Sequence, residues 1–85
     1  MYKVEYSHKV EKFLDKQSDR FIKRFEKSRK KLQINPYRKD MDIKKLKGFK
    51  NDYRLRIGKY RFIYAIIENR SLIYFYHASS RGDIY

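Results

Sequence analysis

The chain has 85 residues, which suffices for one domain with a modest core, and its 41% hydrophobic residues argue against wholesale disorder. Lys and Arg number 23 against 10 Asp and Glu, and the resulting net charge of +13 favours a polyanionic partner: nucleic acid, an acidic protein or an anionic membrane surface. The absence of Cys excludes disulfides, thiolate catalysis and the usual zinc sites, and no apolar run approaches the roughly 18 residues of a membrane-spanning helix.

The first half of the chain predicts one short strand followed by two helices. Residues 2–6 alternate apolar and polar side chains, which indicates a strand with one buried face. Ser7 is placed to cap a helix over residues 8–16, and Ser18 or the residue after it is placed to cap a second helix. That helix ends before Pro36, because the residue preceding a proline is driven out of the helical region. Its many Lys and Arg side chains form either a solvated face or a contact with a polyanion.

The second half predicts a loop, a lysine-rich segment and a meander of three strands. The loop covers residues 37–42, and residues 43–49 follow with few apolar anchors. Residues 53–64 alternate as two strands around a central glycine, and residues 72–78 form a third strand after a turn. At least one lysine of the segment before the meander is expected to lie near the basic residues of the central hairpin.

These elements predict a single α+β domain over residues 1–85. Its sheet is expected to be antiparallel, formed by the N-terminal strand and the C-terminal three-stranded meander. The two N-terminal helices would pack against one face of this sheet. Only small loops are available to cover the other face.

The central hairpin, YRLRIGKYRFIY, concentrates positive charge on one face. If Gly58 and Lys59 form the two-residue turn that glycine favours, the register of the hairpin is fixed. Arg54, Arg56 and Arg61 then lie together on the face away from the core. Because like charges on one face destabilise a sheet, the cluster indicates a missing anion, most simply a phosphodiester bound by guanidinium forks. The alternative is that these arginines form only the solvated face of a half-buried sheet.

In order and length, these motifs resemble the RelE/ParE superfamily of bacterial and archaeal type II toxins. The resemblance covers essentially the whole chain and rests on KLKG at residues 45–48, on the YRLRxGxYRxxY hairpin and on the closing RGDIY at residues 81–85. It implies a toxin that a cognate antitoxin neutralises. RelE-like members cut messenger RNA in the ribosomal A site without metal, whereas ParE-like members inhibit DNA gyrase.

Carried over by position, the RelE-like site implies the catalytic residues Arg54, Arg56, Arg61, Arg81 and Tyr85. The chain departs from RelE at Ser79, where RelE has a further arginine, and at the two hairpin positions 54 and 56, where RelE has lysines. Arginine cannot act as a general base, because its side chain stays protonated at any accessible pH. The arginines suit the stabilisation of negative charge on the phosphorane.

The general base and the general acid stay open among Tyr85, His77 and a lysine. His77 is instead a core-facing strand residue if the loop at Asn69 is two residues long. Tyr85 is alternatively a packing anchor for the chain end, and Arg81 is alternatively a turn residue paired with Asp83. The lysines expected to contact RNA are Lys45, Lys47, Lys50 and Lys59.

The sequence and the resemblance together predict a ribosome-dependent endoribonuclease that needs neither metal nor cofactor. Its expected partners are an acidic antitoxin, messenger RNA, and the ribosome, contacted through ribosomal RNA in the A site of the small subunit. A cytoplasmic location is expected, because the N-terminus has no secretory apolar core. Two alternatives stay open: a ParE-like gyrase inhibitor, and a basic binding module that has lost catalysis.

Overall fold

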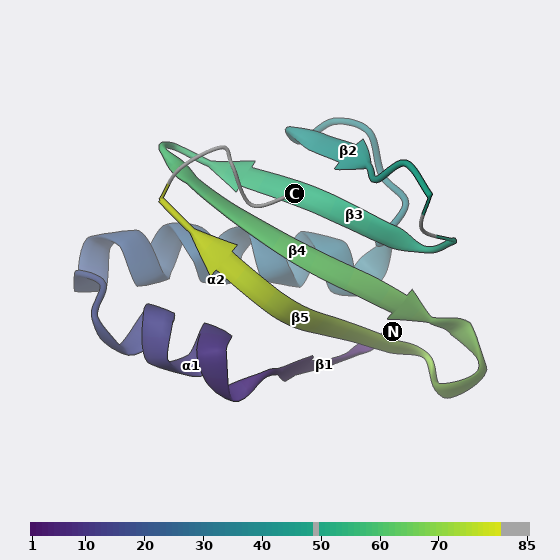
Figure 1. Ribbon diagram of the computed structural model, residues 1–85, viewed down its shortest axis with the longest axis horizontal. Helices are drawn as coiled ribbons and strands as arrows, with labels where there is room; N and C mark the ends of the chain where they lie inside the picture. The colour runs from purple at the N-terminus through teal and green to yellow at the C-terminus, as the bar shows by residue number, and fades with distance from the viewer. Residues whose placement is uncertain (49, 81–85) are drawn as a thin grey trace.

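The computed structural model describes residues 1–48 and 50–80 and confirms the α+β class, with both helices behind one sheet in Figure 1. The elements are β1 (Lys3–Tyr6), α1 (His8–Asp15), α2 (Asp19–Ile34), β2 (Ile43–Lys45), β3 (Asp52–Ile57), β4 (Tyr60–Ile67) and β5 (Leu72–Ser79). A short 3-10 helix, Glu68–Arg70, joins β4 to β5. Among the described residues, neither α1 nor α2 has the length and hydropathy of a membrane-spanning helix.

The five strands lie in the order β1-β5-β4-β3-β2. The predicted antiparallel meander of β3, β4 and β5 is confirmed, but the prediction of a wholly antiparallel sheet is wrong. β1 pairs with β5 in parallel, with Val4 opposite Ile73. The strand β2 was not predicted, and it adds an antiparallel edge beside β3. The sheet is therefore mixed, and β1 and β2 form its two edges.

Both helices begin at the predicted serines. The side-chain oxygens of Ser7 and Ser18 accept hydrogen bonds from the backbone N–H of the third residue of each helix, at 3.2 and 3.1 Å. Such a bond satisfies one of the N–H groups that a helix start leaves unpaired. At the other end of α2, Asn35 is extended, with φ −150° and ψ 99°, as expected for the residue before a proline.

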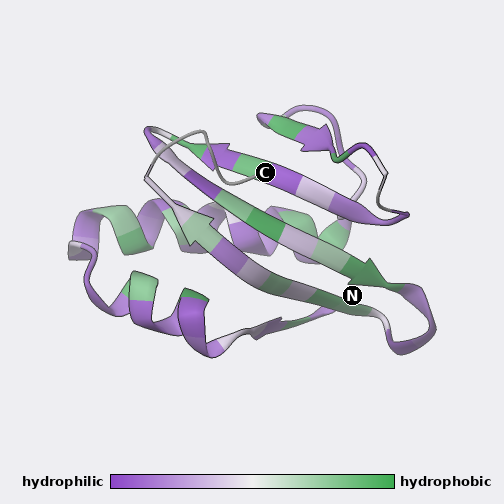
Figure 2. Ribbon diagram, viewed as in Figure 1, coloured by the Kyte–Doolittle hydropathy of each residue, from purple (hydrophilic) through white to green (hydrophobic). Residues whose placement is uncertain are grey.

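The core lies between the helices and the inner face of the sheet, and aromatic rings dominate it. Phe62 on β4 is fully buried, and its ring centroid lies 4.9 Å from that of Phe25 on α2. Tyr64, also fully buried, donates a hydrogen bond to the backbone oxygen of Pro36 at 3.0 Å. Figure 2 shows hydrophobic residues along β4 and β5, and hydrophobic segments that alternate with hydrophilic ones along both helices. The core thereby fixes which face of the hairpin points away from the helices.

Candidate nucleic-acid interface

The hairpin β3–β4 has the predicted register. Gly58 adopts φ +60° in the turn, and Arg56 lies directly opposite Arg61. Arg54 lies two residues before Arg56 on β3 and therefore shares its side of the sheet. We call Arg54, Arg56 and Arg61 the arginine face. Leu55 and Ile57, which alternate with Arg54 and Arg56 on β3, belong to the core, so the arginine face lies on the other side of the sheet. The helices cover only the core side (Figure 1).

The arginine face already contains an anion, the carboxylate of Asp42, which was not predicted. The Asp42 Oδ1 atom lies 2.6 Å from Nη2 of Arg54, and its Oδ2 atom lies 3.5 Å from Nε of Arg56. The backbone N–H of Arg56 also donates to the backbone oxygen of Asp42 at 3.0 Å. The expectation that these arginines lack an anion is therefore wrong for two of them.

Arg61 differs from the other two arginines. It is half-buried and lies between Arg56 on one side and Ser79 on the other. Among residues 1–48 and 50–80, no carboxylate lies within ion-pair distance of its guanidinium. Within this part of the chain, the positive charge of Arg61 is therefore not paired with a carboxylate.

His77 faces the same side as the arginine face, and the expectation that it faces the core is wrong. The connection after β4 is longer than two residues, and the pairing register of β4 with β5 shifts between Ile63 and Tyr64. Residues opposite each other in a sheet share a face, so Arg54, Ile63 and His77 form one row across three strands. Nδ1 of His77 lies 3.0 Å from Nζ of Lys9, and burial, followed by that positive charge, lowers the pKa of His77 below 6.5. Both effects favour the neutral form of the imidazole.

The lysines around β2 divide between the two sides of the sheet. Lys44 lies opposite Arg54, which confirms that one lysine of this segment lies beside the arginine face. Lys45, a predicted RNA contact, lies opposite Tyr53, whose ring stacks on Tyr64 of the core at 5.6 Å. Lys45 therefore points to the opposite side from the arginines.

The other predicted lysines lie at the two ends of β3. Lys47 and Lys50 line a shallow pocket in the turn before β3, whereas Lys59 lies in the turn after it, with Nζ 5.5 Å from the ring centroid of Tyr60. A strand of six residues separates these turns by about 20 Å. The structure therefore brings Lys44 to the arginines but disperses the lysines that the sequence favoured.

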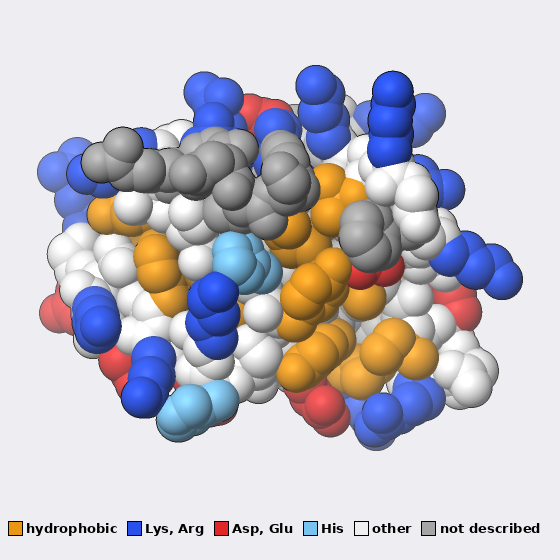
Figure 3. All heavy atoms as spheres, viewed as in Figure 1, with side chains coloured by type: hydrophobic (Ala, Val, Ile, Leu, Met, Phe, Trp, Pro, Cys, Tyr) orange, Lys and Arg blue, Asp and Glu red, His pale blue; other side chains and the backbone are white. Residues whose placement is uncertain are grey.

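Arg81 and Tyr85, the remaining predicted catalytic residues, lie outside the described residues. Within residues 1–48 and 50–80, no group of three His, Asp or Glu side chains could hold a metal ion. Figure 3 shows the sheet face with hydrophobic side chains in its middle and Lys and Arg around its margin. This face combines apolar surface with a cationic border.

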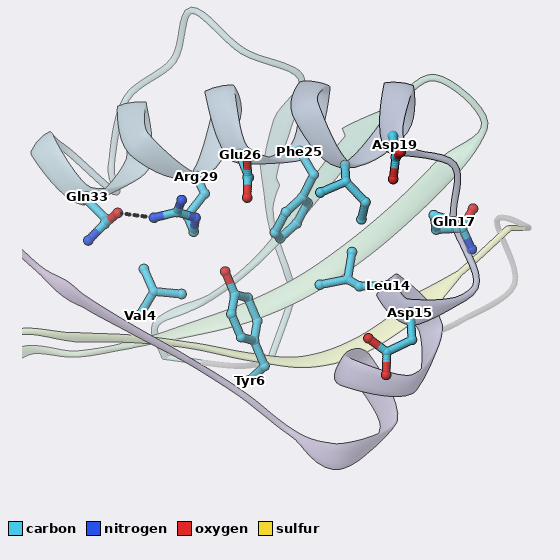
Figure 4. A pocket seen from close by; sticks show the side chains of 11 residues that line it. Val4, Tyr6, Leu14, Asp15, Gln17, Asp19, Phe25, Glu26, Arg29 and Gln33 are labelled. Atoms are coloured by element: carbon cyan, nitrogen blue, oxygen red, sulfur yellow. Dashed lines mark hydrogen bonds between the residues drawn. The ribbon is translucent and has the colours of Figure 1, made fainter.

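A separate cavity lies between β1, α1 and α2, on the other side of the sheet (Figure 4). Tyr6 points across it toward Glu26 and Arg29 of α2. Burial raises the pKa of the Tyr6 phenol, an effect that the nearby Arg29 opposes. The carboxylates of Asp15 and Asp19 also line the cavity, so its charge disfavours a nucleic acid. The arginine face is the better candidate for binding a phosphodiester.

Comparisons with known proteins agree with this geometry. Residues 4–85 match the family described as "ParE toxin of type II toxin-antitoxin system, parDE". The candidate toxin RelE1 of Methanocaldococcus jannaschii is 34% identical, over 99% of this chain and 94% of that protein. A chain of the archaeal RelE-RelB complex from Pyrococcus horikoshii has a TM-score of 0.82 at 30% identity, covering 96% of this chain and 97% of that one. The isolated E. coli RelE toxin has the same TM-score at 15% identity, covering 96% of this chain and 86% of that one, and so shares the fold. The chain therefore belongs to the RelE/ParE superfamily of type II toxins.

Proposed function

We propose that this protein is a ribosome-dependent endoribonuclease that cleaves messenger RNA in the ribosomal A site without a metal ion. The observation that carries the proposal is the arginine face, where Arg56 and Arg61 lie opposite each other on neighbouring strands. A guanidinium presents its N–H donors in a planar fork that matches two oxygens of a phosphate. Relatives at 34% and 30% identity carry the name RelE, and the resemblance to RelE-like toxins implies this activity.

In the proposed reaction, a 2′-hydroxyl attacks the adjacent phosphorus, the bond to the 5′-oxygen breaks, and a cyclic phosphate forms. The attacking oxygen loses a proton and the leaving oxygen gains one. Arg56 and Arg61 would bind the phosphate oxygens as negative charge accumulates on the pentacoordinate phosphorus. Donors aimed at that charge supply the largest share of catalysis in reactions of this kind.

His77 is the described residue beside the arginine face that could take the proton, and it would do so through Nδ1 once the 2′-hydroxyl replaces Lys9 at that nitrogen. Its pKa lies below 6.5, which favours the neutral ring, and it shares the face of the arginines. A positioned base of this kind contributes roughly 10²- to 10⁴-fold to a rate. Tyr85 stays the alternative base or acid that the family resemblance favours, and Arg81 stays a proposed phosphate contact.

A RelB-like antitoxin is the proposed protein partner. The Pyrococcus horikoshii relative was solved as a complex with RelB, and this chain carries a net charge of +13, which an acidic antitoxin would neutralise. Expression with the product of the neighbouring gene tests this: co-purification and restored growth support the pairing. Toxicity that persists in the presence of that product contradicts it.

A second function, inhibition of DNA gyrase, is favoured by one observation. Residues 4–85 match a family whose description names the ParE toxin. A gyrase inhibitor acts by binding protein and leaves messenger RNA intact. Gyrase supercoiling measured with the purified protein separates the two functions, because only the inhibitor lowers it.

The test of the proposed function is to map messenger RNA ends in a translation extract. Wild-type protein should produce new ends at A-site codons, and Arg61→Ala and deletion of Tyr85 should each abolish them. Lys30→Ala is the matched control, because it removes one charge from an exposed position of α2 and should leave cutting unchanged. Intact messenger RNA with the wild-type protein would overturn the proposal.

A further inference from the structure

The anion already present on the arginine face has a consequence for substrate selection. We propose that Asp42 occupies the place where the arginine face receives a phosphate, and that this internal carboxylate keeps the protein from binding free RNA tightly. The inference rests on the proposed function of this face as a phosphodiester site. It makes Asp42 a residue that determines which RNA is accepted.

The contacts of Asp42 are those that a phosphate would make. One carboxylate oxygen accepts from Nη2 of Arg54 at 2.6 Å, and the other lies 3.5 Å from Nε of Arg56. Carboxylates and phosphates are bound by the same guanidinium forks, so the two anions compete for one set of donors. A phosphate and Asp42 cannot both occupy this position.

The carboxylate of Asp42 pairs with only some of the hydrogen-bond donors of Arg54. Arg54 is 8% exposed, and its Nε atom is buried with no hydrogen-bond partner in the part of the chain that the structure describes. A buried donor without an acceptor is unfavourable, and such groups in folded proteins call for an explanation. An incoming phosphate offers more acceptor oxygens than the one that Asp42 gives Arg54.

Asp42 can leave the site while its backbone stays in place. Its side chain is 51% exposed, whereas that of Arg54 is 10% exposed. The backbone oxygen of Asp42 accepts from Arg56 N–H independently of the carboxylate, so a rotation of the side chain does not disturb the pairing of β2 with β3. The pair of Asp42 with Arg56, whose side chains are 51% and 48% exposed, is weak because water and salt screen it. Arg54 is buried and needs an anion, so the carboxylate leaves it only when a phosphate takes its place. The arginine face is therefore fixed and its internal anion is exchangeable.

Asp42 also interrupts a basic groove between α2 and β3. The groove is lined by Arg24, Lys27 and Lys31 of α2 and by Arg56 of β3, with Asp42 as its acidic residue. The carboxylate therefore lowers the attraction of the whole groove for a polyanion. Loss of this one charge would leave a continuous cationic surface from the helix to the arginine face.

The internal carboxylate discriminates between two kinds of RNA. Because it is part of the same chain, it competes at a high effective concentration, which a dilute free RNA cannot match. An RNA that other contacts already hold beside the arginine face also has a high effective concentration there, so its phosphate can displace the carboxylate of Asp42. Asp42 thereby favours RNA presented by a larger assembly over RNA in solution.

The test compares Asp42→Asn with Asp40→Asn by fluorescence anisotropy. Both variants remove one negative charge from the same loop, but Asp40 pairs with Arg38, at 2.6 and 2.8 Å, which is not part of the arginine face. The probe is a short fluorescent oligoribonucleotide with methylated 2′-hydroxyls, which cannot be cut. Asp42→Asn should bind it about threefold to tenfold more tightly and steepen the slope of log K against log salt by ~0.7, as for one added phosphate contact. Asp40→Asn should change affinity less than twofold.

Equal tightening by Asp42→Asn and Asp40→Asn would overturn the proposal, because net charge alone would explain it. Weaker binding by Asp42→Asn would also overturn it, since Asp42 would then only position the arginines. Asp42→Glu keeps the carboxylate and should bind the probe as weakly as the wild type. Tighter binding by Asp42→Glu would also overturn the proposal, and this result does not depend on whether Asp42→Asn folds. The probe needs neither cleavage nor a ribosome, so the result is independent of whether the nuclease activity is found.

Discussion

The hydrogen bond between Tyr64 and Pro36 fixes the end of α2 to the sheet that carries the arginine face. Tyr64 has no exposed surface, and its hydroxyl donates to the Pro36 oxygen at 3.0 Å. The substitution Tyr64→Phe keeps the ring and removes only this donor. The Pro36 oxygen would then be buried without a partner.

Leaving a buried acceptor without a partner costs about 1–3 kcal/mol. For a domain of this size, each kcal/mol lowers the melting temperature by about 4–8 °C, so a loss near 2 kcal/mol corresponds to roughly 8–16 °C. The measurement is thermal unfolding followed by circular dichroism at neutral pH. Tyr74→Phe is the control, because Tyr74 is half-buried on the other side of the sheet. A melting temperature within about 2 °C of the wild type would refute the reasoning, because it would limit the cost to well under 1 kcal/mol.

The same residue predicts how stability depends on alkaline pH. Burial, and then the nearby Tyr53, raise the pKa of Tyr64 above its ordinary value of 10.0. The folded protein therefore keeps this proton while the unfolded chain releases it, so the contribution of Tyr64 is complete below pH 10 and falls as the pH rises further. Tyr64→Phe should show a shallower loss of stability above pH 10 than the wild type.

Three further predictions concern the turn, the histidine and the core. Gly58→Ala should lower stability by about 1–2 kcal/mol in urea unfolding, because Gly58 has φ +60° and the added Cβ would lie 3.4 Å from Nη1 of Arg24; Gly58→Asn should lose less, and equal stability of all three forms would contradict this. His77 should titrate by NMR below 6.5, and Lys9→Gln should raise its pKa. Because the pKa of His77 is lower in the folded protein, the stability linked to His77 is present at neutral pH and lost in acid. An unchanged NMR titration midpoint of His77 in Lys9→Gln would show that Lys9 does not lower this pKa. Phe62→Ala should cost about 3–5 kcal/mol, since the ring is fully buried, and a urea midpoint close to that of the wild type would be incompatible with this packing.

Features that depend on near neighbours in the chain could be predicted from the sequence. A glycine at the first turn position sets the hairpin register, and the structure has Ile57 opposite Tyr60 as that turn requires. Ser7 and Ser18 act as caps through bonds to residues three positions later. In each case a few adjacent residues carry the physical cause.

Features that depend on distant partners could not be predicted in this way. The alternation of β1 identifies a strand but not its direction, because the partner β5 lies at the other end of the chain. β2 has only three residues, two of them lysines, so its pattern is too short to distinguish from a loop.

The same limit applies to the candidate site. Asp42 joins the arginine face only once β2 pairs with β3, and His77 joins its side through an irregular register between β4 and β5. Recognition of β2 would have revealed Asp42, since the pairing of Ile43 with Leu55 places Asp42 beside Arg56. No comparable signal in the sequence marks the irregularity beside His77.

Cleavage of messenger RNA on purified ribosomes with an empty A site tests the central claim most directly. The proposed activity predicts cuts in the A-site codon with wild-type protein that a metal chelator has freed of bound ions before the assay, and only when ribosomes are present. Arg61→Ala should slow the reaction by about 10²- to 10³-fold, as expected for loss of one donor to the developing charge, and Lys30→Ala should not. Uncut messenger RNA, or cutting at the wild-type rate by Arg61→Ala, would contradict the account.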